Sequence, residues 1–117
     1  MFRLTPKLPF ASLLPSFEGD LYFDESPEHT AQRVIYATDA SVYQEMPVAV
    51  AIPKSVADIK RLLRFAKQHG GSHKSIGLIP RAAGTSLAGQ VVGNGIVVDV
   101  SKHFTKILEI NPDEHWV

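Results

Sequence analysis

The stretch PVAVAIPKSVADIKRLLRFAKQHG, residues 47–70, joins a short apolar run to a longer amphipathic one. Residues 48–52 are continuously apolar, which is typical of a strand buried on both faces, and Pro53 ends that run. Ser55 and Asp58 then have the spacing of a capping box at the start of a helix. The pattern predicts a buried strand followed by a helix, the first half of an α/β unit.

The segment after the capping box repeats apolar residues every three or four positions, as one face of a helix does. This apolar stripe consists of Val56, Ile59, Leu62, Leu63 and Ala66. Lysines and arginines fall mainly on the other side, where we expect a solvated outer face rather than an anion-binding surface. Gly70 and Gly71 predict the end of the helix.

Shorter apolar runs follow this helix. Residues 76–80 (IGLIP) and 95–100 (GIVVDV) predict a second and a third strand, the latter introduced by a Gly-Asn-Gly turn signal. Residues 105–110 (TKILEI) predict a fourth strand. Residues 111–113 predict a turn into a hairpin whose returning strand begins in residues 114–117. Because an incomplete hairpin leaves unpaired edge groups, we expect the chain to be the N-terminal piece of a longer protein.

The first part of the chain is less regular. Residues 1–20 contain three prolines and predict an irregular arm with one helical turn near Phe10 to Leu14. Residues 26–37, which begin Ser-Pro-Glu, predict a short helix. We therefore expect an N-terminal arm with a short helix in residues 1–46 and the first part of a larger domain in residues 47–117.

Composition excludes several classes of function. Among 117 residues, 12 are Lys or Arg and 12 are Asp or Glu, so the basic excess of a nucleic-acid-binding protein is missing. No cysteine is present, which excludes disulfides, thiolate catalysis and cysteine-ligated metal centres within these residues. No apolar run approaches the roughly 20 residues that span a bilayer. We expect a cytoplasmic globular protein, with Trp116 and the phenylalanines in its core.

Residues 81–90, RAAGTSLAGQ, follow the second predicted strand. Ligands of strand–helix–strand units collect outside the carboxyl ends of the strands, and this segment starts at such an end. Gly84 can adopt a positive φ and lets the backbone approach a ligand, so that successive N–H groups can form an anion site. Thr85 and Ser86 can donate hydroxyl hydrogen bonds to phosphate oxygens, and Gln90 can donate or accept one turn further on.

Two features of this segment leave alternatives open. Arg81 could supply charge to a phosphate, or it could hold the loop by bonding its carbonyl groups. A short helix starting near Leu87 would direct its positive end toward the same site. The segment also fits a turn with a helix cap and no ligand, because it has neither the lysine of a Walker motif nor the long helix of a dinucleotide fingerprint.

Other constellations are weaker. His69 and His73 have the spacing of two metal ligands on one helix face, but two glycines lie between them, and we expect no metal site. The carboxylates Asp39, Asp99 and Glu109 show no partner spacing for acid–base catalysis. Asp39 and the two residues after it predict a turn instead.

Three blocks of the sequence, in this order and spacing, resemble the first part of the FAD-binding domain of FAD-linked oxidases. They are PVAVAIPKSVADIKRLLRFAKQHG, IPRAAGTSLAGQ and GIVVDVSKHFTKILEINPDEHWV, all within residues 47–117. These oxidases are the vanillyl-alcohol oxidase/p-cresol methylhydroxylase type flavoproteins, and the chain is most similar to their D-lactate dehydrogenase/glycolate oxidase FAD-subunit group. The upstream YATDASVY, residues 36–43, resembles the lead-in of long bacterial members, which often carry a C-terminal iron–sulfur region.

The resemblance implies a fold and a set of cofactor-binding residues. The fold is α/β (α+β): the first subdomain of a two-subdomain FAD-binding fold, a small sheet flanked by helices, preceded by an irregular and helical arm. Residues 81–86 match the segment whose amides and hydroxyls hold the FAD pyrophosphate, residues 89–90 its continuation toward the flavin, and Pro53 a position near the adenine. The implied cofactor-binding residues are Arg81, Ala82, Ala83, Gly84, Thr85, Ser86, Gly89, Gln90 and Pro53.

The chain departs from the family pattern at two places in this loop. Ala82 and Ala83 stand where the family commonly has glycines, which limits the use of positive φ. Thr85 stands where relatives that bind FAD covalently often carry histidine. The resemblance therefore implies FAD that is bound non-covalently.

The resemblance further implies a flavin-dependent oxidoreductase that oxidises a 2-hydroxy acid, of the D-lactate or glycolate type, and passes electrons to an acceptor. We expect no catalytic residue in this chain and no activity or appreciable FAD affinity from residues 1–117 alone. Expected partners are the rest of its own chain, with self-association of the isolated piece, and an iron–sulfur cluster in a C-terminal region outside it. Peripheral attachment to the inner membrane is the alternative to a free cytoplasmic location. The alternatives in function are a small non-catalytic α/β module that binds a phosphate or a protein, and a purely structural domain.

Overall fold

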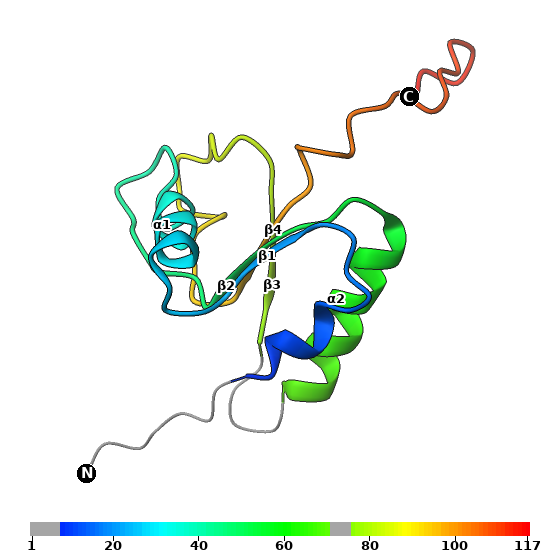
Figure 1. Ribbon diagram of the computed structural model, residues 1–117. Helices are drawn as coiled ribbons and strands as arrows, with labels where there is room; N and C mark the ends of the chain where they lie inside the picture. Colours follow the sequence, from blue (N-terminus) through cyan, green and yellow to red (C-terminus); the bar gives the residue numbers. More distant parts are fainter. Residues whose placement is uncertain (1–7, 71–75) are drawn as a thin grey trace.

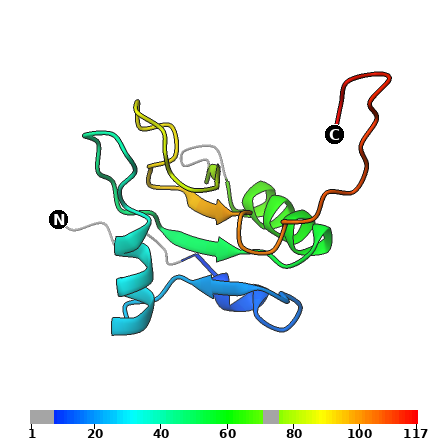
Figure 2. The ribbon, with the colours of Figure 1, turned by 90° about the horizontal axis from the view of Figure 1, so that it is seen from above.

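A four-stranded sheet forms the centre of the molecule. The computed structural model describes residues 8–70 and 76–117. The strands are β1 (Asp20–Tyr22), β2 (Ala49–Ile52), β3 (Leu78–Arg81) and β4 (Ile96–Asp99), in the order β1-β2-β4-β3. β2, β4 and β3 are parallel, and β1 is antiparallel on the β2 edge (Figures 1 and 2). The three parallel strands confirm the strands that the apolar runs predict, whereas β1 was not predicted.

Three helical elements flank the sheet: η1 (Phe10–Leu13, a 3-10 helix), α1 (Pro27–Ile35) and α2 (Val56–His69). The caps form as their residue types predict. Ser26 Oγ accepts the N–H of His29 at 3.3 Å, with Pro27 in the first turn of α1, and Ser55 Oγ accepts the N–H of Asp58 at 3.2 Å. The sequence therefore predicted all three helical elements.

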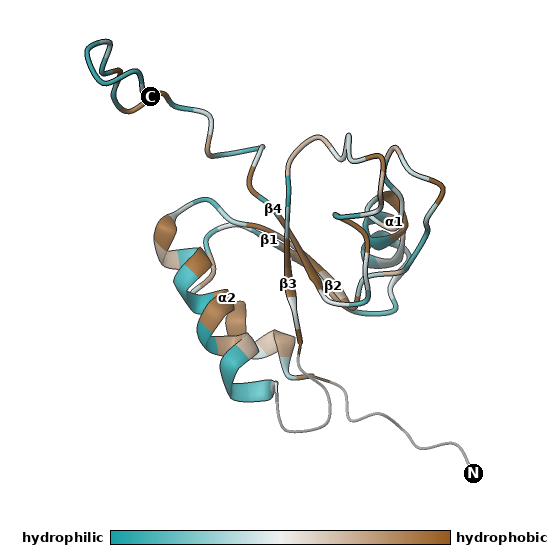
Figure 3. Cartoon of the chain, turned by 180° about the vertical axis from the view of Figure 1, so that it is seen from behind, coloured by the Kyte–Doolittle hydropathy of each residue, from teal (hydrophilic) through white to brown (hydrophobic). Residues whose placement is uncertain are grey.

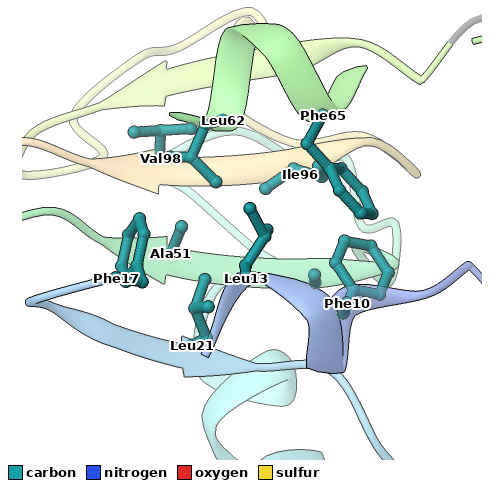
Figure 4. Packing of buried hydrophobic residues seen from close by; sticks show 10 residues of the cluster. Phe10, Leu13, Phe17, Leu21, Ala51, Leu62, Phe65, Ile96 and Val98 are labelled. Carbon is teal, nitrogen blue, oxygen red and sulfur yellow. The ribbon is translucent and has the colours of Figure 1, made fainter. Parts of the chain in front are cut away.

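η1 and α2 cover one face of the sheet, and the main core lies between these two helices and the sheet (Figure 4). Its ten buried residues are Phe10, Leu13, Phe17, Leu21, Ala49, Ala51, Leu62, Phe65, Ile96 and Val98. The ring of Phe10 stacks on that of Phe65 at 5.0 Å between centroids. Residues 8–46 and 47–117 thus share one sheet and one core.

The other face of the sheet is covered by α1 and by the loop after β3. Because side chains alternate along a strand, Val50, Ile52 and Val97 point to this face and pack with Tyr22, Tyr36 and Ile79. Both faces of the central strands are therefore buried. β2 is apolar throughout and β4 is apolar up to Asp99, and these strands are brown in Figure 3.

The predicted apolar stripe of α2 is only partly correct. Leu62 and Phe65 are buried, but Val56 and Leu63 are 59% and 55% exposed. The helix turns a narrower face to the sheet, and this face includes the fully buried carboxylate of Asp58. Spacing alone did not reveal that a charged residue belongs to the buried face.

The predicted fourth strand is wrong. Residues 104–110 form no strand, and the segment extends away from the sheet with Leu108 91% exposed. A strand needs a neighbour to pair with, and this segment reaches neither edge of the sheet. The turn after Asn111 is present, but the returning chain makes only an isolated bridge from Asn111 to Trp116. Trp116 is 44% exposed, so its expected place in the core is also wrong.

None of the helices within residues 8–70 and 76–117 has the length and apolar character needed to cross a membrane. In the same residues, no three His, Asp or Glu side chains come together as potential metal ligands. His73 lies outside the described residues.

Candidate functional site

The loop of residues 82–90 begins at the carboxyl end of β3. The three parallel strands end at the same edge of the sheet, β2 just before Pro53, β3 at Arg81 and β4 at Asp99. The loop then crosses the face that α1 covers before the chain enters β4. The position is the one at which α/β proteins bind ligands.

Two glycines of the loop have positive φ, 69° at Gly84 and 73° at Gly89. Both are closely approached by a side chain. A Cβ atom on Gly89 would lie 2.7 Å from the ring of Tyr43, and one on Gly84 would collide with the guanidinium of Arg81. Glycine is therefore required at both positions by backbone conformation and by space.

Between these glycines the backbone offers unpaired donors. Among the described residues, no group accepts the N–H groups of Gly84, Thr85, Ser86 and Leu87. The hydroxyl of Thr85 also has no partner there, and the residue is exposed. Four successive free N–H groups beside a free hydroxyl form the kind of surface that binds an anion without a net positive charge.

Ser86 shapes the loop through its side chain. Its Oγ accepts the N–H of Gln90 at 3.2 Å and that of Ala88 at 3.4 Å, so its own O–H can still donate to a ligand. The predicted helix near Leu87 is absent; the chain makes bends and a turn at Gln90 instead. The positive φ of Gly89 is incompatible with helix continuation, which is the physical reason for that wrong prediction.

Among the described residues, the partners of Arg81 are carbonyl groups of the segment after α1 and not those of the loop. Its Nη1 donates to the carbonyl of Thr38 at 2.8 Å and more weakly to that of Tyr36 at 3.5 Å, and its guanidinium lies 5.1 Å from the centroid of the Tyr36 ring. Of the two roles that the sequence left open, the structure favours the structural one, in which Arg81 bonds carbonyl groups. These carbonyl groups, however, belong to the segment after α1 and not to the loop itself.

Asp99 on β4 lies beside Arg81 on β3 in the strand register and is the third member of a group with Arg81 and Tyr36. The hydroxyl of Tyr36 donates to Asp99 Oδ2 at 2.6 Å, and the N–H and hydroxyl of Ser101 donate to Oδ1. Burial alone would raise the pKa of Asp99, but these donors together hold it below its ordinary value. The pKa of Tyr36 is raised well above its ordinary value, first by burial and then by the bond to Asp99. Tyr36 therefore remains a donor, and Asp99 a charged acceptor, near neutral pH.

The remaining predicted site residues lie at different depths. Ala82, Ala83 and Gln90 are exposed on the loop. Pro53 lies at the same edge of the sheet, with β4 between it and the loop, and it is fully buried. A contact between Pro53 and a ligand would therefore involve neighbouring backbone rather than the proline ring. Beside Gly89 the loop borders a shallow pocket of about 240 Å³, lined by Tyr43, Gln44, Glu45, Ala88, Gly89 and Val92.

Sequence reasoning missed the partners of Arg81. Tyr36 lies 45 residues before Arg81, and no short spacing connects the two. Asp99 was considered only as an acid–base candidate without a partner and as part of a predicted strand. The signal that could have identified it is a single carboxylate that follows three buried apolar residues, since a charge in that position needs buried partners.

The loop fits the pyrophosphate of a dinucleotide. Its donors are backbone N–H groups and hydroxyls of successive residues, and its two positive-φ glycines give the backbone a shape that other residues rarely adopt. A pyrophosphate is an extended double anion, and the run of free donors from Gly84 to Leu87 is an extended set of positive dipoles. The residues present are therefore suited to hold this part of FAD.

Comparisons with known proteins agree with this geometry. Residues 47–117 match the family described as "FAD binding domain". The D-2-hydroxyglutarate dehydrogenase of Haemophilus influenzae is 45% identical over 101 residues, 86% of this chain and 9% of that protein. The glycolate oxidase subunit GlcD of Bacillus subtilis is 36% identical over 97 residues, 81% of this chain and 19% of that protein. The chain thus spans about a tenth of the length of the dehydrogenase.

A solved structure supports the same fold. Physcomitrella patens BBE-like 1 superimposes with a TM-score of 0.60 at 23% identity, covering 82% of this chain and 20% of that chain. This likeness concerns the fold alone. The family match covers more than half of the chain and includes the complete loop and the strands on both sides of it. The chain therefore belongs to the FAD-binding domain family of the FAD-linked oxidases and dehydrogenases.

Proposed function

We propose that this chain supplies the pyrophosphate-binding part of the FAD site in a flavin-dependent oxidoreductase that oxidises a 2-hydroxy acid. The observation that carries the proposal is the run of free N–H groups from Gly84 to Leu87, held between two positive-φ glycines at the carboxyl edge of the sheet. The family match of residues 47–117 supports FAD as the ligand rather than another phosphate.

The residues of this chain would bind and orient rather than react. The N–H groups of Gly84 to Leu87 and the hydroxyls of Thr85 and Ser86 would neutralise the pyrophosphate by hydrogen bonding. FAD bound in this way would supply the acceptor for a hydride equivalent from the hydroxyl-bearing carbon of the substrate. Asp99 is not free to act as a base, because its carboxylate already accepts hydrogen bonds from Tyr36 and Ser101.

The substrate class is proposed from the relatives. Their names include D-2-hydroxyglutarate dehydrogenase, a glycolate oxidase subunit and D-lactate dehydrogenase, all of which act on 2-hydroxy acids. We propose a 2-hydroxy acid for this protein too, with D-2-hydroxyglutarate as the first compound to test. Groups that bind this acid and pass electrons onward would come from outside residues 1–117. An iron–sulfur cluster would also have to be ligated there, since this sequence has no cysteine.

Residues 1–117 alone are expected to be inactive and to have negligible FAD affinity. The loop presents its donors on an exposed edge, and the segment after β4 leaves apolar side chains such as Leu108 uncovered. Stoichiometric retention of FAD by these residues alone would contradict this expectation.

The proposal is tested by expressing the full reading frame that encodes this chain and recording its visible absorption. A Thr85→Ala/Ser86→Ala variant is purified beside it. Each lost hydrogen bond to a charged group weakens binding by about 1.5–3 kcal/mol, so the variant is expected to bind FAD at least tenfold more weakly. Reduction of the flavin bands by D-2-hydroxyglutarate, D-lactate or glycolate then identifies the substrate.

A Ser72→Ala variant serves as the control, because it also removes one hydroxyl but lies outside the proposed site residues. A colourless parent that FAD cannot reconstitute would refute the proposal and leave a non-catalytic phosphate- or protein-binding module. Equal flavin content in the parent and in the Thr85/Ser86 variant would refute the role of the loop while leaving FAD binding intact.

A further inference from the structure

The segment of residues 36–45, YATDASVYQE, holds the loop of residues 82–90 from the side. It is a closed turn of its own, because Glu45 N–H donates to the carbonyl of Ala37 at 2.9 Å and Thr38 pairs with Gln44. We call it the bracing segment. It lies outside residues 47–117, the part of the chain that matches the FAD-binding family.

Two contacts join the bracing segment directly to the loop. The N–H of Ala40 donates to the carbonyl of Gly84 at 3.0 Å. The ring of Tyr43 fills the space where a side chain at Gly89 would be, with its Cδ2 atom 2.7 Å from an ideal Cβ position. Both positive-φ glycines of the loop are therefore held in place by residues of the bracing segment.

A third contact runs through Arg81. Its guanidinium lies beside Gly84, over the ring of Tyr36, and donates to the carbonyl of Thr38. Tyr36 is in turn fixed to β4 by the 2.6 Å bond from its hydroxyl to Asp99. Arg81, Tyr36 and Asp99 thus connect β3, the end of α1 and β4 beneath the loop.

The surroundings of Arg81 indicate that its charge is not directed to a ligand. The carboxylate of Asp99 is its partner in the strand register, and the carboxylates of Asp99 and Asp39 both lie close enough to interact with its charge. Its guanidinium makes two kinds of contact at once, a hydrogen bond to the carbonyl of Thr38 and a cation–π contact with the ring of Tyr36. A lysine could not reproduce this pair of contacts, although it would keep the charge.

We propose that Arg81, Tyr36 and Asp99 form a positioning cluster that, together with the bracing segment, fixes the loop in its FAD-binding shape. The inference rests on the proposed function of the loop and adds to it that FAD affinity depends on residues 36–45, outside the family's matched region. Arg81 acts through the backbone of the bracing segment and not as a ligand of the pyrophosphate. Free N–H groups bind an anion well only when they are held in place beforehand, and this cluster holds them.

The test uses the full reading frame, prepared without FAD and titrated with it, while flavin fluorescence gives the dissociation constant. The variants are Arg81→Lys, Tyr36→Phe and the double variant. Arg64→Lys and Tyr22→Phe are the matched controls, since Arg64 is exposed and the hydroxyl of Tyr22 has no partner among the described residues. The thermal midpoint of each FAD-free protein is recorded in parallel.

Each single variant is expected to weaken FAD binding by about tenfold at a temperature well below its thermal midpoint, and the controls are expected to match the parent. The double variant should be little weaker than either single variant, because both disrupt one cluster. Tyr43→Ala gives an independent check. This side chain is 59% exposed, so its removal should leave the protein folded while it releases Gly89 and weakens FAD binding.

Several outcomes would overturn the inference. Full affinity in Arg81→Lys would mean that charge alone matters. Thermal midpoints that fall while the dissociation constant stays unchanged would reduce the cluster to a stabilising role, and fully additive losses would mean that Arg81 and Tyr36 act separately. A parent that binds no FAD would remove the proposed function and this inference together. If the parent binds FAD and the Tyr36→Phe and Tyr43→Ala variants bind it equally tightly, only the inference is removed.

Discussion

Gly84 shows at the scale of one residue how the loop depends on its backbone. Its φ of 69° is unfavourable for any residue with a Cβ, and the guanidinium of Arg81 occupies the space that a Cβ would need. Arg81 cannot simply move away, because it is bonded to Thr38 and stacked on Tyr36. Gly84 is thus the point at which loop shape and the positioning cluster meet.

Gly84→Ala is expected to destabilise the protein by about 1–2 kcal/mol, the cost of left-handed backbone for a residue with a Cβ, and to weaken FAD binding as well. Urea unfolding measures the first effect and FAD titration the second. Gly77→Ala is the matched control, because a Cβ there meets no atom within 4 Å and the residue has no positive φ. Parent-like stability of Gly84→Ala would show that the loop adopts another conformation in solution.

At the scale of elements, the start of α2 organises the chain around it through Asp58. This carboxylate is fully buried and accepts four donors: the N–H groups of Glu18, Gly19 and Lys54 at 3.0 Å each, and the guanidinium of Arg61 at 3.0 Å. Asp58 thus joins α2 to the chain that enters β1. The expected capping box is present only from the side of Ser55, because the carboxylate of Asp58 accepts the N–H of Lys54 and those of residues 18–19 instead of the N–H of Ser55.

The pKa of Asp58 predicts a pH dependence of stability. Burial alone would raise this pKa, but the N–H groups of Glu18, Lys54 and Gly19 and the side chain of Arg61 hold it below the ordinary 3.8. The folded protein therefore binds this proton less readily than the unfolded chain. The stabilisation is complete above pH 3.8 and is lost as the pH falls through the lower, folded-state pKa.

Asp58→Asn is expected to lose about 1–3 kcal/mol near neutral pH, since an amide accepts these donors less well and brings an N–H₂ group against them. The difference between the variant and the parent should shrink in acid. Urea unfolding at a series of pH values measures both effects, with Asp113→Asn, an exposed carboxylate, as the control. A difference that stays constant down to strongly acidic pH would contradict the role of the Asp58 charge.

At the scale of the whole molecule, the core joins parts of the chain that are far apart in sequence. Phe10 is 4% exposed and stacks on both Phe23 and Phe65, at 5.5 and 5.0 Å between ring centroids. The N-terminal segment therefore covers the sheet face that the family-matched region would otherwise expose. We therefore expect the stability of the matched region to depend on residues that precede it.

Phe10→Ala is expected to cost about 3–5 kcal/mol, the usual range for a buried phenylalanine, and to lower the FAD content of the purified protein through loss of folded material. Leu14→Ala removes a side chain of similar type that is 52% exposed, and it should change stability by no more than about 0.5 kcal/mol. Unfolding curves in urea measure the change in the free energy of unfolding for both substitutions. Equal effects of the two substitutions would show that the N-terminal segment does not belong to the core.

Local sequence patterns predicted the helices and strands whose formation depends on neighbouring residues. Serine caps and three- to four-residue periodicity located α1 and α2, and continuous apolar runs located the parallel strands. The same reasoning failed for residues 105–110, where a strand-like composition has no neighbour to pair with, and for Leu87, where Gly89 prevents a helix. β1 was missed because three residues carry too little pattern to recognise.

The α/β class and the place of the loop of residues 81–90 can be read from the sequence, because hydrophobic periodicity, caps and glycine spacing act over a few neighbouring residues. The family follows from the resemblance of three sequence blocks to known oxidases. The surroundings of that loop become visible only in the folded chain. Folding brought Tyr36 and Tyr43 from one part of the chain, and Asp99 from another, against Arg81 and the loop glycines. The physical reason is that long-range contacts follow from how strands pair and helices pack, and no spacing along the chain records them.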